Sequence, residues 1–388
     1  MKRRLFQALL LGGLIIALAQ VHWREAESNN IASYQFDTFS EYVSYTKTWL
    51  NDHRRSTALG DHHAEVLANS PFELQPEGEI KGAILLVHGL GDSPFTFKEF
   101  ATTLIKKGFV VRALLLPGHG SHPIDMRNAS VDDWMSTVEY HSALLLQEYD
   151  NVWLGGFSTG ANLVAREAYL NDKVQGLLLF SPGFKPHSPL VRFSSFISTF
   201  KTWAIDEPEL NPVRYTSQTF HGGAEYYKSA KAIQALLESG VYSKPTYMVL
   251  SEDDTVIDPD YAIERFNDTF THPKSHLLWY GENELLPSSP RVTSTAIRSQ
   301  EHQISTGSHM FPLFSMNNQH YGTQSPFRLC RNGQSEENAI KCKDKNEAVW
   351  YSGYGYREEG KVHARLTFNP HYKAMTHSIG HFLSSNLE

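Results

Sequence analysis

Cysteine is scarce in this chain, with only two among 388 residues. So low a count excludes a cysteine-rich zinc module and a small domain held together by several disulfides. The 19 histidines do not change this view, because the sequence contains no H-E-x-x-H motif and no paired Cys/His spacing. We therefore expect no metal site.

An excess of basic residues is also absent. The chain has 35 Lys and Arg against 42 Asp and Glu, which gives a formal net charge of −7. A nucleic-acid-binding protein would show clustered Lys and Arg, so we expect no nucleic-acid partner. The chain is 41% hydrophobic and 12% aromatic, which is enough for a large core. Its length allows one large α/β domain or two smaller ones.

The first residues have the pattern of an export signal or an anchor. Lys2, Arg3 and Arg4 precede a mostly apolar stretch at residues 5–16, and residues 17–19 (A-L-A) fit a small-x-small cleavage site. The stretch is shorter than the roughly 20 residues of a membrane-spanning helix. We expect residues 1–19 to be a cleaved signal peptide or, alternatively, an uncleaved anchor that associates the protein with a membrane. In both cases the body is exported, periplasmic or secreted.

The two cysteines, Cys330 and Cys342, lie close together in a polar stretch. In an oxidising compartment we expect them to form a disulfide, and the alternative is a pair of free thiols. Closing so short a loop would stabilise the fold by about 3 kcal/mol on the chain-entropy view.

Apolar runs and amphipathic patterns alternate along the chain. Strands are predicted at residues 71–74, 83–87, 109–115, 152–154, 174–180 and 246–250, with amphipathic helices at residues 34–55 and 131–149 among others. This alternation predicts a mainly parallel sheet with right-handed crossovers. Functional groups in such a sheet gather at the carboxyl ends of the strands.

Two segments interrupt the alternation. Residues 181–244 are rich in aromatics and show no clear strand, so we predict a cap there. Residues 330–361 are polar and glycine-rich, which indicates an excursion on the surface.

The most informative motif is G-F-S-T-G at residues 156–160. An apolar strand precedes it and a helical pattern follows it, which is the context of a nucleophile elbow. So tight a turn requires positions with almost no side chain, hence Gly156 and Gly160. Ser158 would then sit on a strained corner at the N-terminus of a helix.

A serine nucleophile needs a base and a carboxylate that orients the base. Four acidic residues follow the predicted strand at residues 246–250. We choose Asp254, because the T-V-I that follows it would return the chain to the core. Asp253 is the alternative, and the stretch could also be no more than a solvated acidic turn.

The base is predicted by its place in the chain. His309 follows residues 303–306, which we interpret as the last strand, and it completes the order Ser158, Asp254, His309. Other histidines remain open as alternatives: His276, His302 and His320.

An oxyanion needs two aimed donors. The H-G-L-G at residues 88–91 follows a predicted strand, so we expect the backbone N–H groups of Leu90 and Thr159 to be the donors. His88 is expected to be structural.

Three motifs together carry a family resemblance. V-H-G-L-G-D-S-P at residues 87–94, L-P-G-H-G at residues 116–120 and the elbow resemble α/β-hydrolases of the monoacylglycerol lipase, lysophospholipase and bacterial carboxylesterase group, over roughly residues 71–312. The resemblance implies an α/β fold with a mainly parallel central sheet, helices on both faces and an inserted cap. It also implies a triad of Ser158, Asp254 and His309, Leu90 in the oxyanion hole, and no cofactor.

The expected organisation follows from this resemblance. Residues 20–69 form an N-terminal helical segment, and residues 70–388 form the hydrolase domain, with the cap at about 182–244 and the disulfide-bearing excursion at about 328–361. Asp254 and His309 are 55 positions apart, more than in the family pattern. An insertion around residues 282–298 would account for the difference.

The expected chemistry is acyl transfer from a small-molecule or lipid ester to water. An apolar cap over a polar triad suits an acyl chain, although the cap aromatics could equally pack only against each other. The alternatives are a peptidase or thioesterase of the same fold, or a hydrolase-fold binding protein without catalytic activity.

Overall fold

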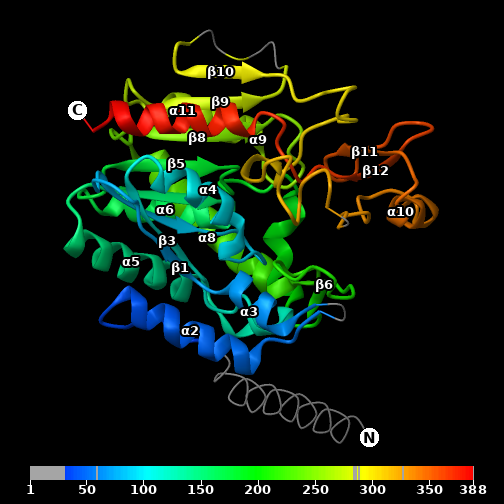
Figure 1. Ribbon diagram of the computed structural model, residues 1–388, viewed down its shortest axis with the longest axis horizontal. Helices are drawn as coiled ribbons and strands as arrows, with labels where there is room; N and C mark the ends of the chain where they lie inside the picture. Colours follow the sequence, from blue (N-terminus) through cyan, green and yellow to red (C-terminus); the bar gives the residue numbers. More distant parts are fainter. Residues whose placement is uncertain (1–30, 58–59, 283–285, 287–288, 326, 388) are drawn as a thin grey trace, which may run out of the picture.

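An eight-stranded, mainly parallel β-sheet forms the centre of the molecule (Figure 1). The computed structural model describes residues 31–57, 60–282, 286, 289–325 and 327–387. Across the sheet the strands follow the order β1-β3-β2-β4-β5-β8-β9-β10, and in this sheet only β1 runs antiparallel to its neighbour. The strands are β1 (Phe72–Leu74), β2 (Gly82–Val87), β3 (Phe109–Leu114), β4 (Val152–Phe157), β5 (Gly176–Phe180), β8 (Thr246–Ser251), β9 (His276–Tyr280) and β10 (Val292–Thr295).

Two hydrophobic cores lie on opposite faces of this sheet. In β2, where every residue is buried, Leu85 and Val87 belong to one core, and Ile84 and Leu86 to the other. Such alternation follows from the two-residue period of a strand. Helices α5 (Val131–Glu148), α6 (Thr159–Leu170), α8 (Phe220–Ser239) and α9 (Pro259–Asp268) contribute to the first core, and α4 (Lys98–Ile105) and α11 (Tyr372–Ser385) to the second. The predicted fold class, an α/β-hydrolase sheet with helices on both faces, is confirmed.

The far edge of the sheet differs from the prediction. Residues 303–306 do not form a strand: Ile304 makes only isolated bridges, to Ser299 and Tyr351. The chain turns sharply there, since Gln303 has a φ of 52°, and a regular ladder cannot continue through such a residue. The sheet ends instead with β10, which pairs in parallel with β9 and lies within the stretch predicted as an insertion.

The segment between β5 and β8 contains short helices and a small sheet. Helix α7 (Ser194–Ile197) is followed by β6 (Trp203–Ile205) and β7 (Gln218–Thr219), which pair antiparallel, so the expectation of no strand here was wrong. Helix α8 then packs against α6 and α7. The cap aromatics divide into buried ones, among them Phe184, Tyr215 and Tyr226, and exposed ones, Phe193, Phe196 and Phe200.

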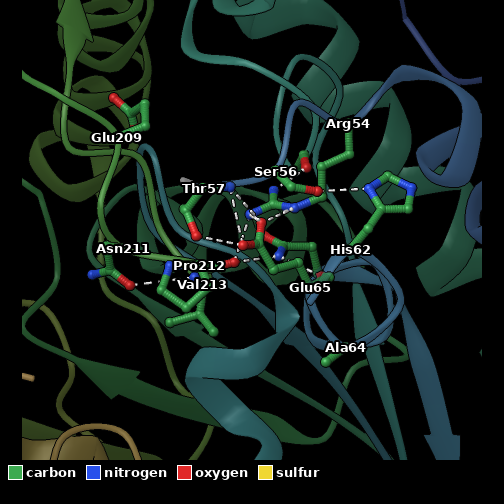
Figure 2. A network of polar contacts seen from close by, with 12 residues as sticks. Arg54, Ser56, Thr57, His62, Ala64, Glu65, Glu209, Asn211, Pro212 and Val213 are labelled. Carbon is green, nitrogen blue, oxygen red and sulfur yellow. Dashed lines mark hydrogen bonds and ion pairs between the residues drawn. The ribbon is translucent and has the colours of Figure 1, made fainter. Parts of the chain in front are cut away.

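The N-terminal part of the described chain packs against the domain through a polar network (Figure 2). Helix α2 (Phe39–His53) is followed by α3 (His62–Asn69). Arg54 and Glu65 are both buried and paired, with Arg54 Nε donating to Glu65 Oε2 at 3.0 Å. Arg54 also donates to the carbonyls of Gly120 and Pro212, at 2.5 and 2.6 Å. The network therefore ties this segment to the cap.

Residues 1–19, expected to be a leader, lie outside the described residues. Within the part of the chain that the structure describes, no helix has the length and apolar character needed to cross a membrane.

The excursion near the C-terminus is a small folded unit. Cys330 and Cys342 are joined by a disulfide, with their Cα atoms 5.6 Å apart. Around it stand α10 (Glu336–Lys343), β11 (Val349–Ser352) and β12 (Val362–Arg365), of which the two strands pair in parallel. The arrowheads of β9 and β10 point to the side on which this unit lies (Figure 1). It therefore lies on the side of the carboxyl ends of the strands.

Candidate active site

The turn between β4 and α6 has the geometry of an elbow. Ser158 has φ 55° and ψ −116°, a strained conformation for a residue other than glycine. A Cβ atom at Gly156 would lie 2.5 Å from the Ala161 nitrogen, and one at Gly160 would overlap the carbonyl oxygen of Val87. Both glycines are therefore required by close backbone approach, and Ser158 is held at the end of β4.

Asp254 and His309 form a direct pair. His309 Nδ1 lies 2.7 Å from Asp254 Oδ2, and the other oxygen, Oδ1, accepts from the backbone N–H groups of Val256 (2.8 Å) and Ile257 (3.1 Å). The Asp254 side chain is fully buried, and that of His309 is 11% exposed. With the carboxylate ionised, Nδ1 carries the proton and Nε2 is left to accept one.

The imidazole lies beside the elbow. The rings of His309 and Phe157, the residue before Ser158, have their centroids 4.9 Å apart. The Ser181 hydroxyl donates to the carbonyl of His309 at 3.0 Å, and Gly183 N–H donates to the Ser158 carbonyl at 3.1 Å. Two residues just after β5 thus hold the histidine loop and the elbow at the same edge of the sheet.

The alternative acid, Asp253, binds a backbone N–H group and not a histidine. Its Oδ2 accepts from the Gly307 N–H at 2.9 Å, which fastens the two loops together, and burial raises its pKa. Among the described residues, Asp254 alone of the two contacts a histidine. The structure thus pairs Asp254, and not Asp253, with His309.

The alternative histidines lie in other surroundings. His320 contacts Asn211 Oδ1 through Nε2 at 3.0 Å and stacks on Phe327, and burial lowers its pKa to about 4. His276 belongs to β9, where its ring packs on Tyr247. The backbone N–H of His302 donates to Ser299 Oγ. Of the described histidines, only His309 pairs with Asp254.

Two backbone N–H groups, one in the elbow and one in the neighbouring loop, have no internal acceptor among the described residues. Among the described residues, neither Leu90 N–H nor Thr159 N–H donates to a protein acceptor, and Thr159 is the first residue of α6, where such groups are free by geometry. A Cβ atom at Gly89 would lie 3.2 Å from Ser158 Cβ, so the loop lies against the elbow.

His88 fixes that loop. Leu116 N–H donates to His88 Nε2 at 3.1 Å, so Nδ1 carries the proton and donates to the Gly89 carbonyl at 2.8 Å. Burial, together with the charge of His119, lowers the pKa of His88 well below its ordinary value. The ring therefore stays neutral and acts as a brace for the backbone that presents Leu90.

Sequence reasoning missed three polar groups of the site. Asp92 is buried, and its pKa is raised by burial against the opposing charges of Arg214 and His309. Arg214 Nε lies 3.4 Å from Asp92 Oδ1. The buried Tyr226 hydroxyl has no partner among the described residues, and burial and the Asp254 charge raise its pKa. Only Asp92, directly after H-G-L-G, could have been suspected from its position.

Sequence comparisons match the chain to hydrolases. A family model described as "Hydrolase_4: Serine aminopeptidase, S33" matches residues 78–210. The chain is 30% identical over 95 residues to a thermostable monoacylglycerol lipase of Bacillus sp. (strain H-257), covering 24% of this chain and 38% of the lipase. It is 22% identical over 208 residues to a carboxylesterase of Bacillus subtilis (strain 168), covering 52% of this chain and 83% of the esterase.

A similar solved structure is the monoacylglycerol lipase of Paleococcus ferrophilus, at 17% identity and a TM-score of 0.44, covering 54% of this chain and 87% of that one. The central sheet has the α/β-hydrolase fold, and the sequence matches are to a monoacylglycerol lipase and a bacterial carboxylesterase.

Proposed function

We propose that the protein hydrolyses carboxylic esters through an acyl-enzyme on Ser158. The observation that carries the proposal is the 2.7 Å contact between His309 and Asp254 beside a serine held in a strained turn. An activated serine needs this combination of a base, an orienting carboxylate and a nucleophile held in a sharp turn. The sequence matches to a lipase and an esterase support the same reaction class.

In the proposed mechanism, Ser158 Oγ attacks the ester carbonyl while His309 Nε2 takes the hydroxyl proton. Asp254 accepts a hydrogen bond from Nδ1 and stabilises the imidazolium, and the two backbone N–H groups on Asp254 Oδ1 keep that carboxylate in place. The imidazolium then protonates the leaving alcohol. A water molecule, deprotonated by His309, attacks the acyl-enzyme and releases the acid.

The negative charge that develops on the carbonyl oxygen is stabilised by Leu90 N–H and Thr159 N–H. Their lack of an internal acceptor among the described residues leaves both free to bind it. Losing one such donor typically costs a factor of about 10²–10³ in turnover. Since both are backbone groups, the support that His88 gives to this loop is part of the proposed machinery.

The competing reactions are separable by their substrates. The matching family model names an aminopeptidase, which would need a carboxylate to bind the free amine of a peptide. Asp92 is the carboxylate next to the site, and it is paired with Arg214, so an ester is the better fit. A thioesterase would use the same groups, and a binding protein without activity would use none of them.

A labelling and turnover experiment tests the proposal. Wild-type protein should react with a fluorophosphonate and hydrolyse p-nitrophenyl esters of increasing chain length. Ser158→Ala should abolish labelling, and His309→Ala and Asp254→Asn should lower turnover by about 10³–10⁴. Asp253→Asn and His320→Ala are the matched controls and should retain most of the activity.

Contrary results have clear meanings. Labelling that survives Ser158→Ala would show that another residue is the nucleophile. Faster turnover of p-nitroanilide or thioester analogues than of esters with the same acyl group would replace the esterase by a peptidase or a thioesterase.

We further propose that the protein acts outside the cytoplasm. The support is the basic and apolar pattern of residues 1–19 together with the Cys330–Cys342 disulfide, a bond that persists in oxidising compartments. Mass spectrometry of the N-terminus of the exported protein would distinguish a cleaved signal, starting at Gln20, from a retained anchor. Protein found only in the cytoplasmic fraction would contradict the proposal.

A further inference from the structure

Two arginines lie beside the histidine loop, one from each of the segments that interrupt the sheet. Arg214 lies in the cap, in the segment that connects β6 to β7. Its Nη1 lies 3.4 Å from the sulfur of Met310, the residue after His309, and its Nε lies 3.4 Å from Asp92 Oδ1. Its side chain is 22% exposed. A cation of the cap is thus one residue away from the proposed base.

Arg365 is brought to the same loop by the disulfide-bearing excursion. It ends β12, opposite Ser352 of β11. The carbonyl of the next residue, Leu366, accepts from the Ser308 hydroxyl at 2.6 Å, and Gly353 N–H donates to Thr306 Oγ1 at 2.9 Å. The excursion is therefore hydrogen-bonded to Thr306 and Ser308, the residues on either side of Gly307 in the loop that leads into His309.

The guanidinium of Arg365 contacts neutral groups. Its Nε donates to the amide oxygen of Asn332 at 2.5 Å, and its guanidinium lies 4.9 Å from the centroid of the Tyr354 ring. In the part of the chain that the structure describes, no Asp or Glu forms an ion pair with it. Burial, and then the positive charge of Arg214, lower the pKa of Arg365 to about 10, against the smaller opposing effects of Tyr354 and Asp254.

Two buried arginines elsewhere in the molecule show how such a charge is compensated when its role is structural. Arg54 is paired with Glu65, and Arg112 with both Glu73 and Glu148. A desolvated charge is costly unless a partner compensates it, and these two obey the rule. Arg365 does not, and its near neighbour is a second cation. Such an arrangement is unfavourable by itself and becomes favourable when an anion binds.

Two carboxylates lie near this pair of arginines, but neither forms an ion pair with Arg365: Asp92 contacts Arg214, and Asp254 contacts His309. The contact of 3.4 Å between Asp92 Oδ1 and Arg214 Nε leaves further N–H groups of the guanidinium available. An arginine presents five donors in a planar fork, which matches carboxylate and phosphate oxygens.

We propose that Arg214 and Arg365 form an anion-binding subsite beside Ser158 and His309, which selects esters that carry a carboxylate or a phosphate group. The inference rests on the proposed ester hydrolysis and narrows its substrate class. Because the two arginines come from the cap and from the excursion, this preference belongs to the segments added to the sheet. The sheet itself supplies the chemistry.

Matched substrate pairs test the subsite. The first pair is mono-4-nitrophenyl glutarate and 4-nitrophenyl pentanoate, which have acyl parts of similar length and differ in a carboxylate. The second is 1-lauroylglycerol 3-phosphate and 1-lauroylglycerol, which differ in a phosphate on the alcohol. For each pair the measured quantity is the ratio of kcat/KM for the anionic ester to that for the neutral one. The two pairs distinguish a carboxylate on the acyl side from a phosphate on the alcohol side.

In Arg214→Gln and in Arg365→Gln, this ratio should fall by roughly 10- to 100-fold for at least one pair, as expected for the loss of a charge-assisted hydrogen bond. Arg365→Lys, which keeps the charge but not the planar fork, should give an intermediate ratio. Arg192→Gln, at an exposed position of the cap, should keep the wild-type ratio. If Arg365→Gln does not fold, Arg214→Gln gives the same comparison.

The outcomes separate this inference from the proposed function. If the wild-type protein hydrolyses the neutral esters and the ratio stays at the wild-type value in the Gln variants for both pairs, the subsite is wrong and the esterase stands. If the wild-type protein hydrolyses none of the four esters, the esterase falls and the subsite falls with it.

Discussion

Gly160 is constrained both by the elbow to which it belongs and by the strand end that it contacts. Gly160 is the second residue of α6, and its Cα faces the carbonyl oxygens of Val87 and His88 at the end of β2. The same strand end leads into the loop that presents Leu90. The backbone of the elbow and the backbone of the oxyanion loop therefore touch, and a side chain at position 160 would separate them.

Gly160→Ala should lower both stability and activity. Helix propensity alone would favour the alanine by up to about 1 kcal/mol, but the new Cβ overlaps backbone atoms that cannot move away cheaply. We expect a net destabilisation of about 1–3 kcal/mol and a fall in kcat of at least about 10-fold, because Ser158 and Leu90 shift relative to each other.

Urea unfolding and turnover of a p-nitrophenyl ester measure the two effects. Gly240→Ala is the matched control, since position 240 has an extended φ of 170° and no atom within 4 Å of an added Cβ. A Gly160→Ala protein that is more stable than wild type and fully active would show that the contact is not restrictive.

At this scale the sequence is informative where a motif dictates geometry. Ser158 could be predicted because a G-x-S-x-G between strand and helix has one interpretation, and Asp254 and His309 from their order along the chain. Arg214 and Arg365 could not, because they lie in segments without a periodic pattern. Their positions near His309 depend on contacts such as that of Ser308 with Leu366, between residues 58 positions apart.

At the scale of elements, a buried ion pair joins helices α2 and α3. Arg54 Nε meets Glu65 Oε2 at 3.0 Å, and Glu65 Oε1 accepts from the Thr57 N–H at 3.0 Å. The side chains of the pair are 5% and 2% exposed. Since Arg54 also donates to the Pro212 carbonyl, two residues before Arg214, this pair connects the N-terminal helices to the cap.

Glu65→Gln should destabilise the protein by about 3–5 kcal/mol, because it leaves the buried charge of Arg54 without a counter-charge. Arg54→Met should have a similar effect, for the converse reason. The double variant should lose clearly less than the sum of the two, because it removes both charges at once.

A double-mutant cycle on the free energy of unfolding, obtained with urea, measures this coupling. Glu337→Gln, in the exposed pair with Lys341 on α10, is the control and should show no resolvable change. Strict additivity of the two buried substitutions would contradict the coupling.

Elements with a clear apolar run or amphipathic pattern were mostly predictable, but β9, in which four of five residues are buried, was not predicted. The strand β2 and the helix α5 follow from a continuous apolar run and from an amphipathic pattern. The edge strand β10 has the sequence V-T-S-T with two exposed central residues, and β7 has only two residues, so neither leaves a hydrophobic signal. Their pairing is decided by neighbouring strands, which local sequence does not record.

For the whole molecule, the buried histidines couple stability to pH. Burial lowers the pKa of His119 to about 4, and burial together with the charge of Arg112 lowers the pKa of His141 to about 3. Both rings are therefore neutral in the folded state, whereas in the unfolded chain they bind a proton below about pH 6.5. The unfolded state then holds more protons, so folding stability decreases as the pH falls from 6.5 toward 4.

His141→Phe should flatten this dependence. The His141 ring packs on Phe39 and Tyr42, with centroids 5.5 and 4.4 Å away, so a phenyl ring fits among the same neighbours. Between pH 7.5 and pH 5 the free energy of unfolding of the wild type should fall by about 2 kcal/mol more than that of the variant. The reason is that the wild type must keep the His141 ring neutral in the folded state, whereas the variant has no ring to protonate there. Urea unfolding at pH 7.5, 6 and 5 measures the difference, and His63→Gln, at an exposed position of α3, should keep the wild-type slope. Parallel curves for the wild type and His141→Phe would mean that this ring takes up its proton as readily in the fold as outside it, and that the acid sensitivity of the molecule arises elsewhere.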